Sequence, residues 1–208
     1  MPKVTEDYRA ERRRQIAAAA LRCFARKGFE GTSMSDIIAE SGLSAGAIYL
    51  HYKNKQDLVS QVVVDVLRDR STDLIGIAAL DPLPEPAEVV RIFVTGMTHE
   101  LGSEGILVQV WAIAAREPGL SALIFDLIGE LSRLFSDYFA AWFRRCGLDD
   151  AEAGERAALM TPVIISICQG YVLQAAILPG FDPSRYLASV AAIDFAAVRA
   201  PAGDSLGA

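Results

Sequence analysis

Apolar residues recur at three- and four-residue spacings along almost the whole chain. Between residues 8 and 27, Ile16, Ala20 and Phe24 form one apolar stripe, and most of the arginines lie off it. This period is typical of amphipathic helices that bury one face, whereas a half-buried strand would alternate at every second residue. No stretch of the chain alternates in that way. The pattern therefore predicts an all-α protein.

Capping residues and helix breakers divide this pattern into about nine helices. Asp149 can cap one helix, and Asp182 before Pro183 is an N-cap with proline at the first helical position. The segment 81–86, DPLPEP, cannot be regular helix, because proline removes amide donors and restricts the residue before it. The expected helices cover 8–27, 35–41, 44–52, 54–77, 87–101, 104–115, 119–145, 150–178 and 183–198.

Residues 33–57 predict two short helices joined by a tight turn and followed at once by a third helix. Ser33 and Asp36 have the spacing of a capping box, in which hydroxyl and carboxylate satisfy the free amides of a helix start. Gly42 tolerates the left-handed backbone that ends a helix, and Ser44 supplies an N-cap oxygen for the next one. The pattern is that of a helix-turn-helix, which lays a helix in a DNA groove.

The second short helix is predicted to have two different faces. Its buried face carries Leu43, Ala47, Ile48 and Tyr52. The opposite face carries Ala45, Gly46, Tyr49 and, near its end, His51. Two of these residues are very small, so the backbone can approach a groove closely.

The run from about Arg9 to Leu58 resembles the DNA-binding domain of the tetracycline-repressor (TetR) family. The resemblance lies in FEGTSMSDII from Phe29, SGLSAGAIY from Ser41 and HYKNKQDL from His51. A bare helix-turn-helix would be weak evidence, because any helical hairpin with a glycine turn imitates it. Here the flanking segments agree in order and spacing as well.

The resemblance implies an N-terminal three-helix helix-turn-helix DNA-binding domain, expected over residues 1–55. A C-terminal helical ligand-binding and dimerisation domain is expected over residues 56–199. The last residues, 200–208, have little apolar content beyond small side chains and are expected to form a disordered tail.

The resemblance also implies roles for individual residues. Thr32 and Ser33 match positions that bind phosphate through hydroxyls and helix-start amides, Tyr49 and His51 match backbone contacts, and Lys55 matches a phosphate-binding lysine. Base reading falls to Ser44, Ala45 and Gly46, with Tyr49 contributing. Relatives often carry longer polar side chains where this chain has alanine and glycine. Direct readout is therefore expected to be sparse, and DNA shape is expected to carry more of the specificity.

Charge is distributed unevenly along the chain, whose formal net charge is −6. Residues 1–55 contain ten Lys and Arg against six Asp and Glu, and the remaining residues contain ten against twenty. A basic head on an acidic body confines contact with DNA to one end. The arginines at 12, 13, 22 and 26 are either an ordinary solvated face or phosphate contacts of an N-terminal arm, and the sequence leaves both readings open.

In the family, the last two long helices of each subunit pack against those of a second subunit, which implies a homodimer. Residues 161–178 are apolar nearly all round, as such an interface requires, although a core helix of a monomer would look similar. A membrane span is disfavoured, because Pro162, Gln169 and Gln174 interrupt the segment. A homodimer would place two reading helices about one DNA turn apart, ~34 Å, on an inverted-repeat operator.

The resemblance further implies a small-molecule effector that releases a repressor from its operator. An apolar or amphipathic effector fits the candidate lining best, although aromatic residues at helical spacing normally pack with each other as core. A regulator without an effector, or an activator, is the alternative. The candidate lining residues are Phe93, Met97, Gln109, Trp111, Phe125, Tyr138 and Trp142.

An enzyme is not expected. The chain has only two histidines, one of them in the helix-turn-helix, and no nucleophile elbow, phosphate loop or paired metal motif, so no catalytic residue, metal or cofactor is assigned. Cys23, Cys146 and Cys168 are expected to be small core residues in a reducing cytoplasm. The N-terminus lacks an apolar secretory segment, which also indicates a cytoplasmic protein.

Overall fold

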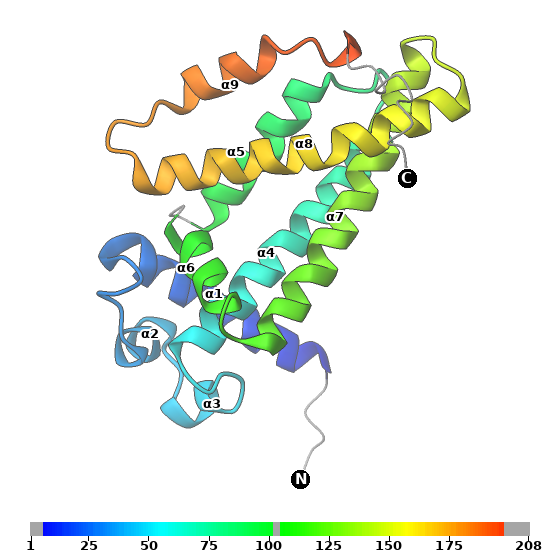
Figure 1. Cartoon of the computed structure of the whole chain (residues 1–208). Coiled ribbons are helices and arrows are strands. Elements are labelled where there is room, and N and C mark those ends of the chain that lie inside the picture. The colour runs from blue at the N-terminus through cyan, green and yellow to red at the C-terminus, as the bar shows by residue number, and fades with distance from the viewer. Residues whose placement is uncertain (1–5, 102–104, 198–208) are drawn as a thin grey trace, which may run out of the picture. The chain divides into compact units, whose positions relative to one another are not determined.

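The structure is a computed structural model that describes residues 6–101 and 105–197. Over these residues it contains nine α-helices, one short 3-10 helix and no strands (Figure 1), which confirms the predicted all-α fold. The helices are α1 (Glu6–Lys27), α2 (Met34–Ser41), α3 (Ala45–Tyr49), α4 (Lys55–Ala78), α5 (Pro86–Leu101), α6 (Gly105–Ala114), α7 (Pro118–Arg145), α8 (Asp150–Ile177), α9 (Pro183–Ala191) and the 3-10 helix η1 (Phe195–Ala197).

The helix starts expected from capping residues are present. Ser33 caps α2 in a complete capping box, and the Ser44 side chain accepts a hydrogen bond from the Ala47 amide at the start of α3. Asp149 and Asp182 cap α8 and α9 in the same way. These boundaries were predictable because each one depends on residues within a few positions of the helix end.

The chain forms two compact units that are not continuous in sequence. The first comprises Met1–Arg68 and Gly96–Ile124, and the second comprises Asp69–Thr95 and Phe125–Ala208. The helices α4, α5 and α7 each contribute residues to both units.

The first unit contains the three N-terminal helices and a small apolar core. Ile16 and Phe24 of α1, Ile37 of α2, Ile48 of α3 and Leu58 of α4 are each at most 1% exposed. Each short helix therefore contributes a fully buried isoleucine to this core. Because burying such a side chain stabilises by about 1.5–3 kcal/mol, the short helices are held mainly by packing and by their caps.

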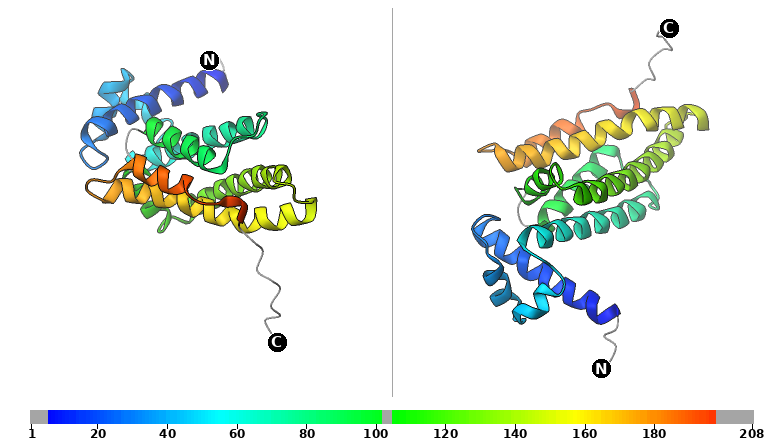
Figure 2. Two further views of the ribbon diagram at one scale, coloured as in Figure 1. Left: turned by 90° about the horizontal axis from the view of Figure 1, so that it is seen from above. Right: turned by 60° about the horizontal axis from the view of Figure 1, so that its bottom comes forward.

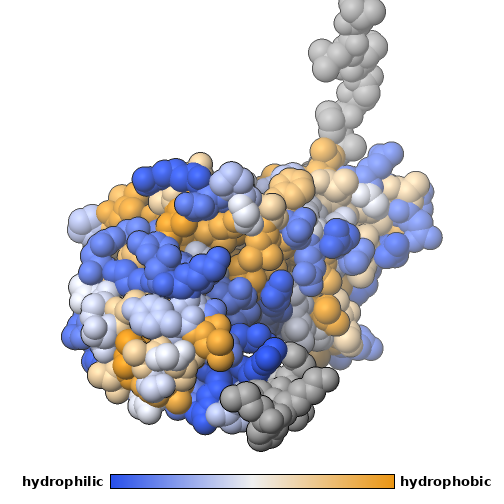
Figure 3. Space-filling view, turned by 90° about the horizontal axis from the view of Figure 1, so that it is seen from below, coloured by the Kyte–Doolittle hydropathy of each residue, from blue (hydrophilic) through white to orange (hydrophobic). Residues whose placement is uncertain are grey.

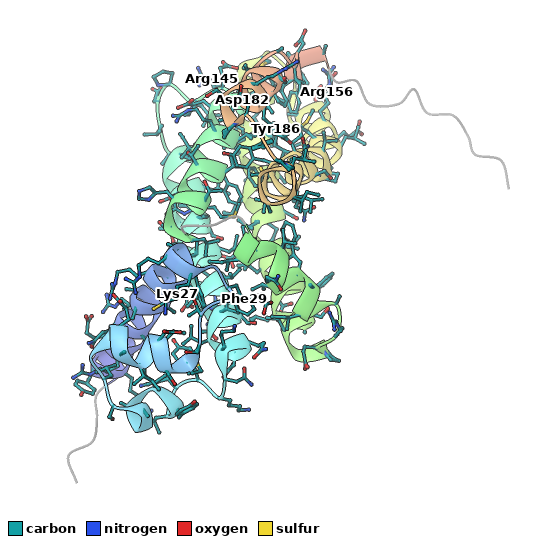
Figure 4. All side chains as sticks on the ribbon, turned by 90° about the vertical axis from the view of Figure 1, so that its left-hand side faces the viewer. Lys27, Phe29, Arg145, Arg156, Asp182 and Tyr186 are labelled. Carbon is teal, nitrogen blue, oxygen red and sulfur yellow. The ribbon has the colours of Figure 1, made fainter. Side chains whose placement is uncertain are left out.

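The second unit has an aromatic core along α7 and a close pair formed by α8 and α9. Figures 1 and 2 both show α9 running beside α8. The hydroxyl of Tyr186, labelled in Figure 4, donates to the Ile167 carbonyl of α8 at 2.7 Å. A Cβ at Gly170 would lie 3.1 Å from that hydroxyl, so glycine lets α9 come this close. The buried aromatic residues of α7 are Phe135, Tyr138, Phe139, Trp142 and Phe143.

Two expected helix ends differ from the structure. The helix α3 ends at Tyr49, so Tyr52 lies beyond it, although the Tyr52 side chain is buried as expected. The last helix ends at Ala191, not near residue 198, because the Asp194 carboxylate accepts hydrogen bonds from two following amides and starts η1. This turn brings Phe195 into the core. The expected tail, residues 200–208, lies outside the described residues.

The expectation that all three cysteines belong to the core is wrong for one of them. Cys23 and Cys168 are buried, but Cys146 is exposed. It follows the end of α7 directly and precedes Gly147, whose φ of 94° turns the chain toward α8. The expectation was based on the general burial of free cysteines, and it does not hold at a turn that leads out of a helix.

The helix α8 is long and apolar enough to cross a membrane by length and composition. A core helix of a soluble protein passes the same test, so this property alone is weak evidence for a membrane span.

Figure 3 shows one face of the molecule, on which hydrophilic residues gather in broad areas around smaller apolar patches.

Candidate nucleic-acid interface

The helix α2 is fixed at its start by Ser33, Asp36 and Lys27. The Ser33 amide donates to the Asp36 carboxylate at 2.8 Å, and the Asp36 amide donates to the Ser33 hydroxyl at 3.1 Å. Lys27 of α1 donates to the same carboxylate at 2.6 Å. The Lys27 ammonium and the Ser33 hydroxyl and amide hold the pKa of Asp36 well below its usual range. The helix start is thus ordered before any ligand binds.

The turn between α2 and α3 presents the predicted reading residues to solvent. Gly42 has a φ of 68°, the left-handed conformation in which glycine is favoured, and it turns the chain toward Ser44. Ile48 is fully buried, while Ala45 and Gly46 are exposed and the Tyr49 side chain is 51% exposed. A Cβ at Gly46 would meet no atom within 4 Å. The structure therefore places the predicted base-reading residues together on one open face.

Lys55 and Thr32 hold the turn that precedes α2. The Lys55 ammonium donates to the carbonyls of Phe29 and Thr32 at 2.8 and 2.9 Å and lies 4.2 Å from the centre of the Phe29 ring. Phe29 and Lys27 are labelled in Figure 4. Thr32 is 2% exposed, and its hydroxyl donates to the Gly28 carbonyl at 2.8 Å. Thr32 and Lys55, two of the three residues that the resemblance assigns to phosphate binding, therefore also support the fold.

Two of the arginines that the sequence left open form ion pairs within the first unit. Arg22 and Arg26 of α1 each contact one oxygen of the Glu40 carboxylate of α2 at 2.6 Å. The hydrogen bonds from Arg26 and Arg22 lower the pKa of Glu40 to about 2. Sequence reasoning did not single out Glu40, because the spacing of 14 and 18 residues carries no local signal.

His51 lies at the end of the reading segment, half-buried, and lines a cavity of about 600 Å³ in the first unit. Burial and the nearby Arg13 and Arg9 lower its pKa. The imidazole is therefore more readily neutral than a free histidine. The cavity is also lined by Leu50, Tyr52, Asp57, Gln61, Asp65 and Arg68.

The seven predicted effector residues are divided between the two units. Met97, Gln109 and Trp111 belong to the first unit, where Gln109 lines a second cavity of about 830 Å³ together with Phe29 and the start of α4. The other four belong to the second unit, and they are Phe93, Phe125, Tyr138 and Trp142.

Three of the four residues in the second unit are core residues with partners. The rings of Phe93 and Phe135 are 5.4 Å apart, and the Tyr138 hydroxyl donates to the Pro84 carbonyl at 2.6 Å. The Trp142 indole donates to the Glu85 carboxylate at 3.2 Å. Phe125, by contrast, is 76% exposed.

The fold and the site define an all-helical protein with an exposed, capped helix-turn-helix. The model of the family described as bacterial regulatory proteins, tetR family, matches residues 16–62, so this part of the chain is similar to that family.

Named relatives share this part of the chain. The transcriptional regulator YfiR of Bacillus subtilis is 39% identical over 62 residues, which cover 30% of each chain. The transcriptional repressor AcnR of Corynebacterium jeikeium is 38% identical over 68 residues, covering 33% of this chain and 36% of AcnR. The chain thus spans about a third of the length of these curated relatives.

Solved structures resemble the chain over a longer range. A TetR transcription regulator from Haloarcula marismortui superposes with a TM-score of 0.67 at 15% identity, covering 86% of this chain and 92% of that one. At this identity the likeness concerns the fold alone.

Proposed function

We propose that the protein is a DNA-binding transcriptional regulator whose reading helix is α3. The observation that carries the proposal is the geometry of this helix, which is buried through Ile48 and open at Ala45, Gly46 and Tyr49. A short helix that is capped, anchored by one apolar residue and otherwise exposed can enter a major groove without unfolding its own unit.

We propose two kinds of DNA contact for the predicted site residues: contacts that position the protein on the DNA backbone, and contacts that read the bases. Tyr49 and His51 contact the DNA backbone, and the start of α2 offers amides to a phosphate. Lys55 uses two of its three N–H donors on carbonyls, so one donor is left for a phosphate oxygen. Because Ala45 and Gly46 offer no polar side chain, groove shape and contact with thymine methyl groups contribute to specificity.

A titration of labelled DNA tests this assignment. The preferred sequence is first selected from a random duplex library, and affinity is then measured by fluorescence anisotropy at one fixed salt concentration. We expect Tyr49→Ala to weaken binding by about 1–3 kcal/mol. Ile75→Ala, at a residue of the second unit that is 56% exposed, is the matched control and should bind like the parent protein. If Tyr49→Ala binds DNA as tightly as Ile75→Ala and the parent protein do, the assignment of α3 as the reading helix is wrong.

The protein is further proposed to bind DNA as a homodimer through α8. Leu159, Val163, Leu173 and Ile177 lie on one face of this helix and are 39%, 49%, 43% and 58% exposed. Exposed apolar residues in a helical row mark a surface that another apolar surface covers. A second copy of α8 offers the same face, which suits a two-fold interface and an inverted-repeat operator.

Repression that a small apolar or amphipathic molecule relieves is proposed as the mode of regulation. An effector that prefers one conformation of the α4 connector by about 1–3 kcal/mol changes DNA affinity roughly 5- to 150-fold. The chain has two tryptophans, Trp111 and Trp142, and both are candidate effector contacts. To test this mode, variants that each keep one tryptophan are screened against a metabolite and drug library. Binding is detected by a change in tryptophan fluorescence and by a shift in melting temperature. A protein that represses but responds to no compound supports a regulator without an effector.

A further inference from the structure

A side chain of α1 binds the end of α2 at the turn that leads to α3. The Gln15 side-chain amide donates to the Ser41 carbonyl at 3.0 Å, although the two residues lie 26 positions apart in the chain. Ser41 is the last residue of α2, so its carbonyl is one of those that no amide of the same helix can reach. Because Ser41 is only 7% exposed, this carbonyl has little access to water. The bond from Gln15 therefore satisfies it and holds the end of α2 against α1.

Arg12 determines which way the Gln15 amide points. Its guanidinium donates to Gln15 Oε1 at 2.7 Å and lies 4.8 Å from the centre of the Tyr8 ring. A guanidinium has only donors, so its partner is the amide oxygen, and the NH₂ group is then directed toward the Ser41 carbonyl. Glutamine offers an acceptor and a donor at the end of one side chain. Arg12 and Ser41 together therefore specify the residue at position 15.

The turn that follows Ser41 is closed by the Ser41 side chain. The Ser41 hydroxyl donates to the Ile38 carbonyl at 2.9 Å and accepts from the Leu43 amide at 3.1 Å. Gly42 lies between Ser41 and Leu43 with a φ of 68°, and Ser44 then caps α3. The end of α2, the turn and the start of α3 are thus joined by short hydrogen bonds. A displacement of the Ser41 carbonyl therefore also moves the start of α3.

The remaining polar contacts between α1 and α2 are of a different kind. Ion pairs join the two helices at Asp36 and Glu40, and the basic side chains in these pairs are about half exposed. An exposed pair of long side chains tolerates small movements of the backbone. The bond from Gln15, by contrast, reaches the backbone at the turn itself.

We propose that Gln15 is a positioning residue for DNA recognition: through the Ser41 carbonyl it sets the position of the turn and thereby the angle at which α3 meets the groove. This inference rests on the proposed DNA-binding function. Because Ala45 and Gly46 have no polar side chain that could adjust to a displaced helix, base discrimination depends on where the backbone of α3 lies. Phosphates occur at every step of the duplex, so backbone contacts tolerate a displacement better. Loss of the Gln15 bond therefore lowers specific binding more than non-specific binding.

Two variants at position 15 test this role. Gln15→Leu removes both hydrogen bonds, whereas Gln15→Glu keeps the acceptor for Arg12 and loses the donor for Ser41. The measured quantity is the ratio of the affinities for the selected duplex and for a scrambled duplex at one fixed salt concentration. We expect this ratio to fall about three- to tenfold in both variants, which is the size of effect that one hydrogen bond can have.

Two controls separate positioning from charge and from stability. Ala25→Glu adds the same charge as Gln15→Glu at an exposed position of α1. Val62→Ala removes buried contacts of α4 and lowers the melting temperature. At a temperature at which every variant is folded, both controls should keep the affinity ratio of the parent protein. The proposal requires a fall in both Gln15 variants and in neither control, and any other pattern overturns it. If Gln15→Leu does not fold, Gln15→Glu compared with Ala25→Glu decides alone.

The carbon-13 chemical shift of the Ser41 carbonyl tests the contact without DNA. We expect this shift to change in both Gln15 variants, because the carbonyl loses its donor, and to stay the same in Ala25→Glu. A parent protein that prefers no duplex would refute the DNA-binding function on which the inference rests. An unchanged carbonyl shift in the Gln15 variants would instead refute the role of Gln15, so the two failures are distinguishable.

Discussion

Replacing Lys55 by methionine tests whether this lysine acts on the fold, on DNA or on both. Methionine keeps most of the apolar stem but removes the ammonium that bonds the carbonyls of Phe29 and Thr32 at 2.8 and 2.9 Å. A hydrogen bond that involves a charged group contributes about 1.5–3 kcal/mol, and the contact with the Phe29 ring adds up to roughly 1 kcal/mol. After allowance for partial solvation of the ammonium, we expect the variant to lose about 2–4 kcal/mol of stability.

Urea unfolding at one fixed protein concentration measures this loss, and amide hydrogen exchange localises it. Exchange should speed up in the turn 28–33 and at the start of α2. Lys53→Met, two residues earlier at an exposed lysine, is the control and should change stability by less than about 0.5 kcal/mol. If Lys55→Met unfolds at the same urea concentration as the control but binds DNA more weakly, the ammonium acts on phosphate and not on the turn.

Three further predictions concern other parts of the chain. Glu40→Gln should lower the melting temperature at neutral pH. Because the ion pairs with Arg26 and Arg22 depress the pKa of Glu40 to about 2, their contribution is full above pH ~4.5, the ordinary pKa of a glutamate. The difference from the parent should shrink as the pH falls below that value and vanish near the folded-state pKa of about 2. Tyr138→Phe should cost about 1–2 kcal/mol in urea unfolding, since a buried hydroxyl loses its carbonyl acceptor at 2.6 Å; an unchanged midpoint would contradict that. Leu173→Glu should shift the protein from dimer to monomer in sedimentation equilibrium, and a persistent dimer would exclude this face of α8.

Local signals in the sequence predicted most helix boundaries of the head. Ser33 with Asp36, Gly42 and Ser44 each determine backbone geometry within three residues, and each has the predicted role in the structure. The exposed character of Tyr49 was predictable for a similar reason, because the helical period turns it about 100° away from the buried Ile48.

Contacts between distant residues were not predictable in this way. The carbonyls that Lys55 binds lie 23 and 26 residues earlier in the chain, and nothing in the local sequence indicates them. The same holds for Tyr52. The apolar pattern predicts that its ring is buried, but it gives no sign that its hydroxyl finds no hydrogen-bond partner within residues 6–101 and 105–197. The candidate effector residues show the limit most clearly, because periodicity identifies an aromatic residue as buried but cannot distinguish a core contact from a cavity wall.

The open space around Gly46 has a consequence for how this protein can change its target. A Cβ added there would meet no atom within 4 Å, and glycine inside a helix is less favourable than alanine by about 1 kcal/mol. Gly31 offers no such freedom, because a Cβ there would lie 2.4 Å from the Lys27 carbonyl. Gly46→Ala in α3 is therefore expected to keep or raise stability, whereas Gly31→Ala in the turn before α2 is expected to lower it. The proposed recognition helix can therefore be altered at Gly46 more easily than the turn before α2 can be altered at Gly31.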